Sequence, residues 1–221
     1  AHGDAAAVAE ARALAEDADS DVRQAAVWAL GEVALRGDEA ALAAASARLE
    51  DAAGAVRQVA VWAVGRLSER GGQQGIAAVR PRLEDADENV RHLAVWALGQ
   101  IAESGDEGAL LSVAAAFRDQ DHNVRQAAAW AAGRLAKKGD ARTVAALSPC
   151  LSDVSPGVRQ VAAWAMSKAA QKGDEQAIAA ITTCLQDPDE SVRQLAARVL
   201  RKLKVKGRHS SRRRCERVPV K

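Results

Sequence analysis

The sequence predicts an all-α fold, a right-handed α-solenoid in which helical hairpins stack into a superhelix, and three observations support this prediction. The segment VRQAAVWALG at residues 22–31 returns in related form at residues 56, 90, 124, 158 and 192, each time after 34 residues. A strict period of this length is typical of a stacked repeat array. The composition is also helix-forming, since alanine and leucine are abundant and the 221 residues include only 5 Pro.

The chain begins with half a unit. Residues 1–18 align with the second half of a repeat, because Gly3 and Asp4 correspond to Gly37 and Asp38. The missing first half indicates either a cleaved or partial chain or a natural N-terminal cap.

The first helix of each full unit is expected to start after a capping residue such as Asp19, whose short side chain can accept from the free N–H groups. Apolar residues such as Val22, Ala26 and Leu30 then follow at helical spacing. A glycine ends the helix, and we expect it at positive φ, where glycine is least strained. This glycine column contains Gly3, Gly37, Gly71, Gly105, Gly139, Gly173 and Gly207.

The second helix of each unit is expected to begin at the aspartate after that glycine and to run for about twelve residues, with Leu42, Ala45 and Leu49 buried. Pro81 and Pro149 fall inside this helix and should bend it. Neither helix can bury its apolar stripe alone, so the units must stack.

The C-terminal end differs from the rest of the chain. In the sixth copy Arg198 replaces the tryptophan and Arg201 replaces a small residue, which is the polar end that a solenoid needs. The formal charge is −8 over residues 1–197 and +10 over residues 198–221, and such asymmetry is typical of an interaction tail. We therefore divide the chain into a repeat array at 1–206 and a basic tail at 207–221.

The repeated aspartates and Val-Arg pairs carry a family resemblance over residues 1–206. Asp17 and Asp51 begin an aspartate column, and a Val-Arg pair follows in each copy. With the Ala-Leu-Gly helix end, these motifs resemble the HEAT-repeat family, most of all the HEAT-like units of phycobilisome lyases. The resemblance implies that the arginines form a hydrogen-bonded ladder between units, although an anion-binding role is the alternative. These arginines are Arg23, Arg57, Arg91, Arg125, Arg159 and Arg193.

Motifs for catalysis, metal binding or cofactor binding are not found, so we expect a protein that is not an enzyme and carries no metal or cofactor. The four histidines form no ligand-spaced pair, and no His-Glu dipeptide like that of HEAT-like deoxyhypusine hydroxylases occurs. Cys150 and Cys184 share one repeat position, which should place them about 8–10 Å apart on stacked helices, too far for a disulfide. Free thiols favour an intracellular, reducing compartment.

All the tryptophans occupy one repeat position. On a helical projection this position lies about 140° from the apolar stripe, normally a polar site on the outer helix. The rings could pack against a neighbouring unit, or they could form an exposed surface for a partner. We select the partner surface, formed by Trp28, Trp62, Trp96, Trp130 and Trp164.

The basic residues at the C-terminal end form a second candidate partner site. Nucleic acid, anionic lipid or an acidic protein surface would each suit their charge. The residues are Lys202, Lys204, Lys206, Arg208, Arg212, Arg213, Arg214 and Arg217.

The sequence thus predicts a non-enzymatic protein–protein interaction scaffold, a peripheral subunit of a larger complex. The first alternative is a solenoid associated with nucleic acid or ribonucleoprotein through its basic tail. The second alternative is a phycobilin-lyase-like protein. The sequence contains no apolar run long enough for a transmembrane segment. Alanine- and arginine-rich arrays of this type resemble those of algae, so an organelle such as a plastid is the expected setting.

Overall fold

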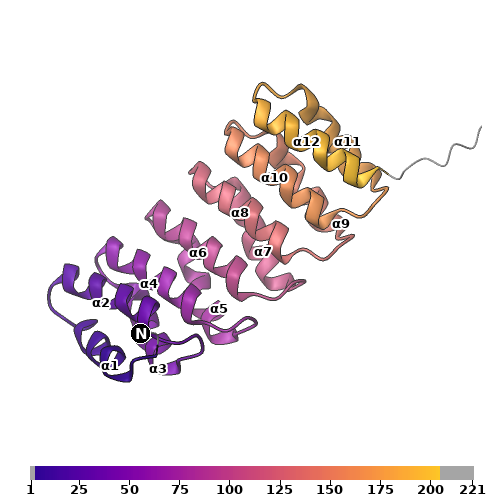
Figure 1. Ribbon diagram of the computed structural model, residues 1–221. Coiled ribbons are helices and arrows are strands. Elements are labelled where there is room, and N and C mark those ends of the chain that lie inside the picture. The colour runs from indigo at the N-terminus through magenta and orange to yellow at the C-terminus, as the bar shows by residue number, and fades with distance from the viewer. Residues whose placement is uncertain (1–2, 205–221) are drawn as a thin grey trace, which may run out of the picture.

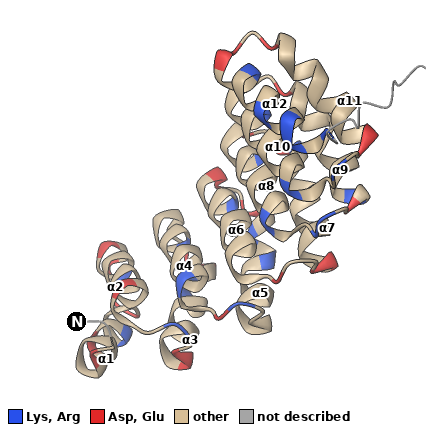
Figure 2. Ribbon diagram, turned by 45° about the vertical axis from the view of Figure 1, so that its right-hand side comes forward, with Lys and Arg blue, Asp and Glu red and all other residues tan. Residues whose placement is uncertain are grey.

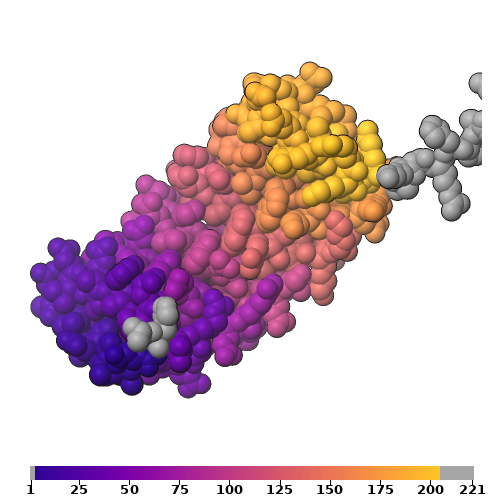
Figure 3. Space-filling model, in the orientation of Figure 1, coloured from indigo at the N-terminus to yellow at the C-terminus, as the bar shows by residue number. Residues whose placement is uncertain are grey.

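The computed structural model describes residues 3–204, and within that range the chain forms α helices and short 3-10 segments, without strands. Two rows of helices run side by side along an elongated body (Figure 1). The space-filling view shows the units stacked in chain order from one end to the other (Figure 3). The predicted α-solenoid of helical hairpins is therefore confirmed.

One row carries the repeated segment, and we call its members the long helices, because each has 14 residues. Their capping residues are Asp19, Ala53, Asp87, Asp121, Ser155 and Asp189, and each of the four aspartates accepts a hydrogen bond from the first turn, as predicted. The long helices are α2 (Ser20–Val33), α4 (Gly54–Leu67), α6 (Glu88–Ile101), α8 (His122–Leu135), α10 (Pro156–Ala169) and α12 (Glu190–Leu203).

The other row contains the short helices. They are α1 (Ala5–Leu14), α3 (Glu39–Ala47), α5 (Gln73–Val79), α7 (Glu107–Ala115), α9 (Ala141–Leu147) and α11 (Glu175–Thr183). From α3 onward each continues into a 3-10 segment, η1 (Arg48–Glu50), η2 (Arg80–Glu84), η3 (Ala116–Arg118), η4 (Pro149–Ser152) or η5 (Cys184–Gln186).

The prediction that Pro81 and Pro149 bend the second helix is wrong. The α helix ends before each proline, so α5 and α9 have 7 residues where α3, α7 and α11 have 9. The short helices without a proline also pass into a 3-10 segment, so the proline, which lacks the N–H group that would extend the α-helical bonding, only makes this change come earlier.

The turn glycines have the predicted conformation and a further role. Gly3, Gly37, Gly71, Gly105, Gly139 and Gly173 have φ values between +80° and +87°. Each N–H group donates to a backbone carbonyl at the end of the next long helix, as from Gly37 to Leu67 at 2.7 Å and from Gly71 to Ile101 at 2.6 Å. The turn within one unit therefore caps the long helix of the next unit. Gly207 lies outside the described residues.

The two rows are packed unequally. Neighbouring long helices pack closely along their length, whereas neighbouring short helices make few contacts with each other. Because the more closely spaced row must follow the shorter arc, the long helices line the concave side of the curve. The sequence-based placement of the tryptophan-bearing helices on the outer side is therefore wrong.

Candidate interaction surface

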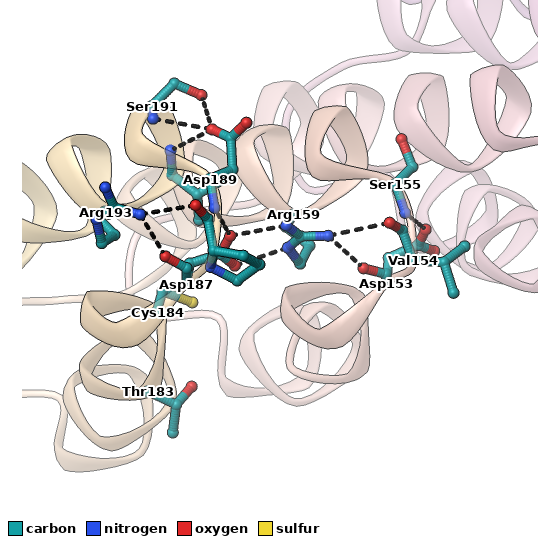
Figure 4. Close-up of polar contacts among 12 residues, drawn as sticks. Asp153, Val154, Ser155, Arg159, Thr183, Cys184, Asp187, Asp189, Ser191 and Arg193 are labelled. Atoms are coloured by element: carbon teal, nitrogen blue, oxygen red, sulfur yellow. Dashed lines mark hydrogen bonds and ion pairs between the residues drawn. The ribbon is translucent and has the colours of Figure 1, made fainter.

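Arginine–aspartate pairs tie each unit to the next. Arg159 donates from Nε and Nη2 to the two carboxylate oxygens of Asp187, both at 2.7 Å. Its Nη1 donates to the backbone carbonyls of Asp153 and Val154, in the loop before its own helix (Figure 4). The same arrangement joins Arg23 to Asp51, Arg57 to Asp85, Arg91 to Asp119 and Arg125 to Asp153.

These pairs form the ladder that the family resemblance implied. Paired carboxylates are well shielded from solvent, with side-chain exposures of 5–13%. Hydrogen bonds from Arg125 hold the pKa of Asp153 below its usual value, and those from Arg159 do the same for the pKa of Asp187. The five guanidinium groups are thus fully engaged in bidentate, charge-assisted bonds, and the alternative anion-binding role is not supported.

The tryptophan rings lie against glycines of the preceding unit. A methyl carbon built on Gly99 would lie only 2.8 Å from Cζ3 of Trp130, and one built on Gly133 would lie 2.7 Å from Cζ3 of Trp164. Trp62 and Trp96 lie against the preceding unit's glycine in the same way. The absent side chain therefore provides the space that each ring fills.

A fully open tryptophan surface is therefore a wrong expectation for Trp62, Trp96, Trp130 and Trp164. These rings are half-buried and pack on the hydrophobic core, whereas Trp28 is 55% exposed. The helical projection describes one helix by itself, so it could not show that the neighbouring helix covers the tryptophan position. Partner binding by the tryptophans remains a prediction.

A cation one turn further along the same helix lies over three of the rings. The distance from the cationic group to the ring centroid is 5.4 Å for Arg66 on Trp62, 5.4 Å for Arg134 on Trp130 and 5.7 Å for Lys168 on Trp164. Such cation–π contacts stabilise a ring by about 0.5–1 kcal/mol at exposed sites. Each of these rings is thus held between a glycine and a cation.

A column of polar side chains lies one helical turn before the tryptophans, and the sequence analysis missed it. Its signal was the same 34-residue spacing. We call it the polar column: Gln24, Gln58, His92, Gln126, Gln160 and Gln194. Between α6 and α8, His92 and Gln126 line a hollow of about 360 Å³ together with Trp96 and Trp130. The side chain of Gln194 bonds to Glu190, and the other side chains of the column have no hydrogen-bond partner within residues 3–204.

The C-terminal half of the long-helix row is cationic. Lys138, Lys168 and Lys202 are exposed, and none forms a salt bridge with a described acidic residue. Partial desolvation of its ammonium group, together with the charges of Lys168 and Lys202, lowers the pKa of Lys138, whose Nζ donates to the carbonyl of Ser167 at 2.9 Å. Figure 2 shows Lys and Arg on the neighbouring helices α10 and α12.

The predicted basic site is only partly within the described residues. Lys202 and Lys204 are exposed at the end of α12, as expected. Lys206, Arg208, Arg212, Arg213, Arg214 and Arg217 lie outside the described residues.

Cys150 and Cys184 are free thiols, as predicted. Both are buried and form no disulfide. Burial raises the pKa of Cys150 to about 11, so this thiol stays protonated at neutral pH. The described range also holds no cluster of three or more His, Cys, Asp or Glu side chains arranged for a metal ion. No helix among residues 3–204 is both long enough and apolar enough to cross a membrane.

A stack of two-helix units joined by bonds between neighbours defines a repeat solenoid, a class that is generally non-catalytic and typical of protein-interaction scaffolds. More particularly, the chain belongs to the HEAT repeats family, which matches residues 1–65, 45–132, 76–167 and 109–201. No curated protein sequence matches this chain.

Several solved structures share the fold. A designed armadillo repeat protein in complex with the peptide (KR)4 has 24% identity and a TM-score of 0.68, with 89% of this chain and 99% of that chain covered. An engineered protein has 20% identity and a TM-score of 0.68, covering 89% and 96%. The YibA protein of E. coli has 22% identity and a TM-score of 0.65, covering 87% and 69%. At these identities the likeness shows the fold alone.

Proposed function

We propose that this chain is a non-enzymatic scaffold, a peripheral subunit of a larger assembly, which binds an extended acidic segment of another protein along the long-helix row. The observation that carries the proposal is the polar column. It repeats in every unit although the fold itself makes almost no use of its hydrogen-bonding groups within residues 3–204.

The spacing of the polar column suits an extended peptide. Packed helices lie about 8–10 Å apart, which is about the length of three extended residues. A glutamine amide can both donate to and accept from a peptide backbone. Each unit could therefore bind the backbone of the segment at one point, while the neighbouring tryptophan edges contact its side chains.

Charge indicates what kind of segment fits. Near the N-terminal end Glu32 lies 3.7 Å from Arg66 and offsets its charge. Toward the C-terminal end Arg134, Lys168 and Lys202 have no acidic partner among the described residues. The designed armadillo repeat protein shows that a fold of this kind can hold a peptide, in that case a basic one. The cations of this chain favour an acidic one.

The test measures binding of a labelled oligoglutamate peptide by fluorescence anisotropy. Lys168→Glu combined with Lys202→Glu should weaken binding by about tenfold or more, because two attractions become repulsions. Arg36→Glu combined with Arg70→Glu is the matched control, since it makes the same charge change at exposed turns near the other end. It should have little effect. Deleting residues 207–221 from every variant removes the contribution of the tail.

A second pair of changes tests the polar column at constant charge. Gln126→Ala combined with Gln160→Ala should also weaken binding. Equal loss in the lysine pair and the arginine control would contradict the proposal. So would tighter binding of a single-stranded RNA of equal charge, which would instead favour the nucleic-acid alternative.

A further inference from the structure

The hollow between α6 and α8 lies within the long-helix row, and one small residue helps to open it. Ala127 lines the hollow at a repeat position where the neighbouring units carry Leu93 and Val161. These larger side chains pack on the hydrophobic core, as do Val59 and Leu195 at the same position of other units. The alanine leaves part of that space unfilled, and the hollow has a volume of about 360 Å³.

Two tryptophan rings form the apolar walls of the hollow. Trp96 and Trp130 line it, and both are half-buried. Arg134 lies over the ring of Trp130, whereas the residue one turn after Trp96 is Gln100, which accepts a hydrogen bond from Arg134 at 3.2 Å. Among the four rings that pack on a glycine, Trp96 alone has no described cation over it. Its ring is therefore available to an aromatic side chain of a partner.

Three polar side chains line the rest of the hollow. His92, Asn123 and Gln126 have no side-chain hydrogen-bond partner within residues 3–204. The carbonyl oxygen of Gln126 lies close to α10, since a methyl carbon built on Gly157 would be 2.7 Å from it. His92 and Gln126 each precede a tryptophan by four residues, which is about 6 Å along a helix. The hollow thus has a polar end and an aromatic end, separated by about the length of one side chain.

His92 interrupts the glutamines of the polar column. Desolvation lowers the pKa of His92, and the nearby charge of Asp121 opposes this only in part. The imidazole is therefore mostly neutral at pH 7, with one donor and one acceptor nitrogen. Together with the amides of Asn123 and Gln126 it suits a neutral hydroxyl group, which also donates and accepts, better than a charged group.

We propose that this hollow is a specificity pocket for one tyrosine side chain of the acidic segment. The phenol ring lies against Trp96 and Trp130, and its hydroxyl group bonds to His92 and Gln126. A tyrosine matches the hollow because it joins an apolar ring to a single polar group. The inference rests on the proposed function and adds a register to it, since the tyrosine fixes which part of the segment lies beside the lysines of α10 and α12.

The experiment measures binding of three labelled oligoglutamate peptides to the full chain by fluorescence anisotropy. Their central residue is tyrosine, phenylalanine or alanine, so all three carry the same charge. The tyrosine peptide should bind about tenfold more tightly than the alanine peptide, with the phenylalanine peptide between them. Equal binding of the three would overturn this inference alone. Absence of binding by all three would overturn the proposed function as well.

Filling the hollow tests where the tyrosine binds. Ala127→Leu introduces the residue that α6 carries at this position, and it should remove the preference for tyrosine while leaving binding of the alanine peptide unchanged. Ala25→Leu is the matched control, because it makes the same change at the other alanine of this repeat position. It should keep the preference. Thermal melting checks that both variants are folded, and a preference that survives Ala127→Leu would contradict the proposal.

A change at His92 tests the hydroxyl contact separately. His92→Leu should bring the tyrosine and phenylalanine peptides to equal affinity, because only tyrosine loses a hydrogen bond. His92→Gln restores the usual residue of the polar column and should retain most of the difference. An unchanged difference in His92→Leu would overturn the assignment of the hydroxyl group. Tighter binding of a peptide with a central lysine would also overturn the inference, because a cation over Trp96 would then be the preferred occupant.

Discussion

The interface between α8 and α10 and the interface between α10 and α12 have the same fold but different side chains. In the first, Trp164 lies against Gly133. In the second, Ser167 stands at the glycine position and Arg198 at the tryptophan position. The second pair of helices is also less extensively packed.

This difference shows that the tryptophan and the glycine of the preceding unit work as one pair. A large ring needs a neighbouring backbone without a side chain, and where the ring is lost the glycine is lost too. The arginine ladder changes at the same end: Arg193 still bonds to the carbonyls of Asp187 and Pro188, but no described carboxylate pairs with it. Three pairs of substitutions and one pH comparison test this contrast, from the largest expected effect to the smallest.

Adding a side chain at an internal glycine should have the largest effect. Cβ of Gly99→Val would lie 2.8 Å from Cζ3 of Trp130 and 2.9 Å from Cβ of Ala131. The free energy of unfolding should fall by about 3 kcal/mol, the upper range for overpacking. Ser167→Val, at the same repeat position in the last interface, should cost less than about 1 kcal/mol. Urea denaturation followed by circular dichroism measures both, and equal losses would refute the pairing.

A charge within the tryptophan ladder should cost less, and the cost should depend on the unit. Trp96→Glu places a carboxylate against Gly65 and should reduce stability by about 2 kcal/mol. Trp28→Glu, at a position that is 55% exposed, should cost less than about 0.5 kcal/mol. Thermal melting of the isolated chain is the readout. Similar melting temperatures for the two variants would indicate that Trp96, like Trp28, lies on an open surface.

Removing a guanidinium from the ladder should have an intermediate effect. Arg125→Met leaves the shielded carboxylate of Asp153 without its two charged donors and should cost about 1–2 kcal/mol. Arg193→Met removes only bonds to backbone carbonyls and should cost about half as much. If the two variants unfold at the same urea concentration, the ion pair contributes nothing to stability.

The smallest effect is a change in pH dependence. The folded-state pKa of Asp153 is lowered by its bonds with Arg125. The pair therefore contributes stability above the unfolded pKa, about 3.9, and that stability is lost as the pH falls through the folded pKa. The difference between the wild type and Arg125→Met should be full at pH 7 and should shrink below about pH 4. A constant difference between pH 7 and pH 3 would contradict this assignment.

The sequence was sufficient for the fold because each structural role returns at one spacing. The aspartate caps and the glycines at positive φ follow from single residues and local backbone chemistry. The arginine–aspartate ladder was predicted only through the family resemblance. Nothing in one unit shows that Arg23 reaches Asp51 in the next.

The surface was less predictable, for a physical reason. The direction of Trp96 follows from its own helix, but its exposure depends on how closely the preceding helix approaches, and Gly65 sets that approach. A usable signal existed in the sequence. The glycines beneath the rings, Gly31, Gly65, Gly99 and Gly133, give way to Ser167 in the same interface in which Arg198 replaces the tryptophan. The hydrogen bond from Gly37 to Leu67 joins two backbone groups, so it requires no particular side chain and could not be predicted from the sequence.

The unequal packing of the two rows has a mechanical consequence. Neighbouring long helices are joined by ion pairs, by backbone hydrogen bonds and by tryptophan rings that pack on glycines, so their spacing is stiff. The short helices have few links to one another, so their spacing is compliant. When the array bends, the spacing of the short helices on the convex side should therefore change, while the spacing of the long helices on the concave side stays constant. A partner bound along the concave edge would meet sites at a constant interval even as the curvature of the whole array changes.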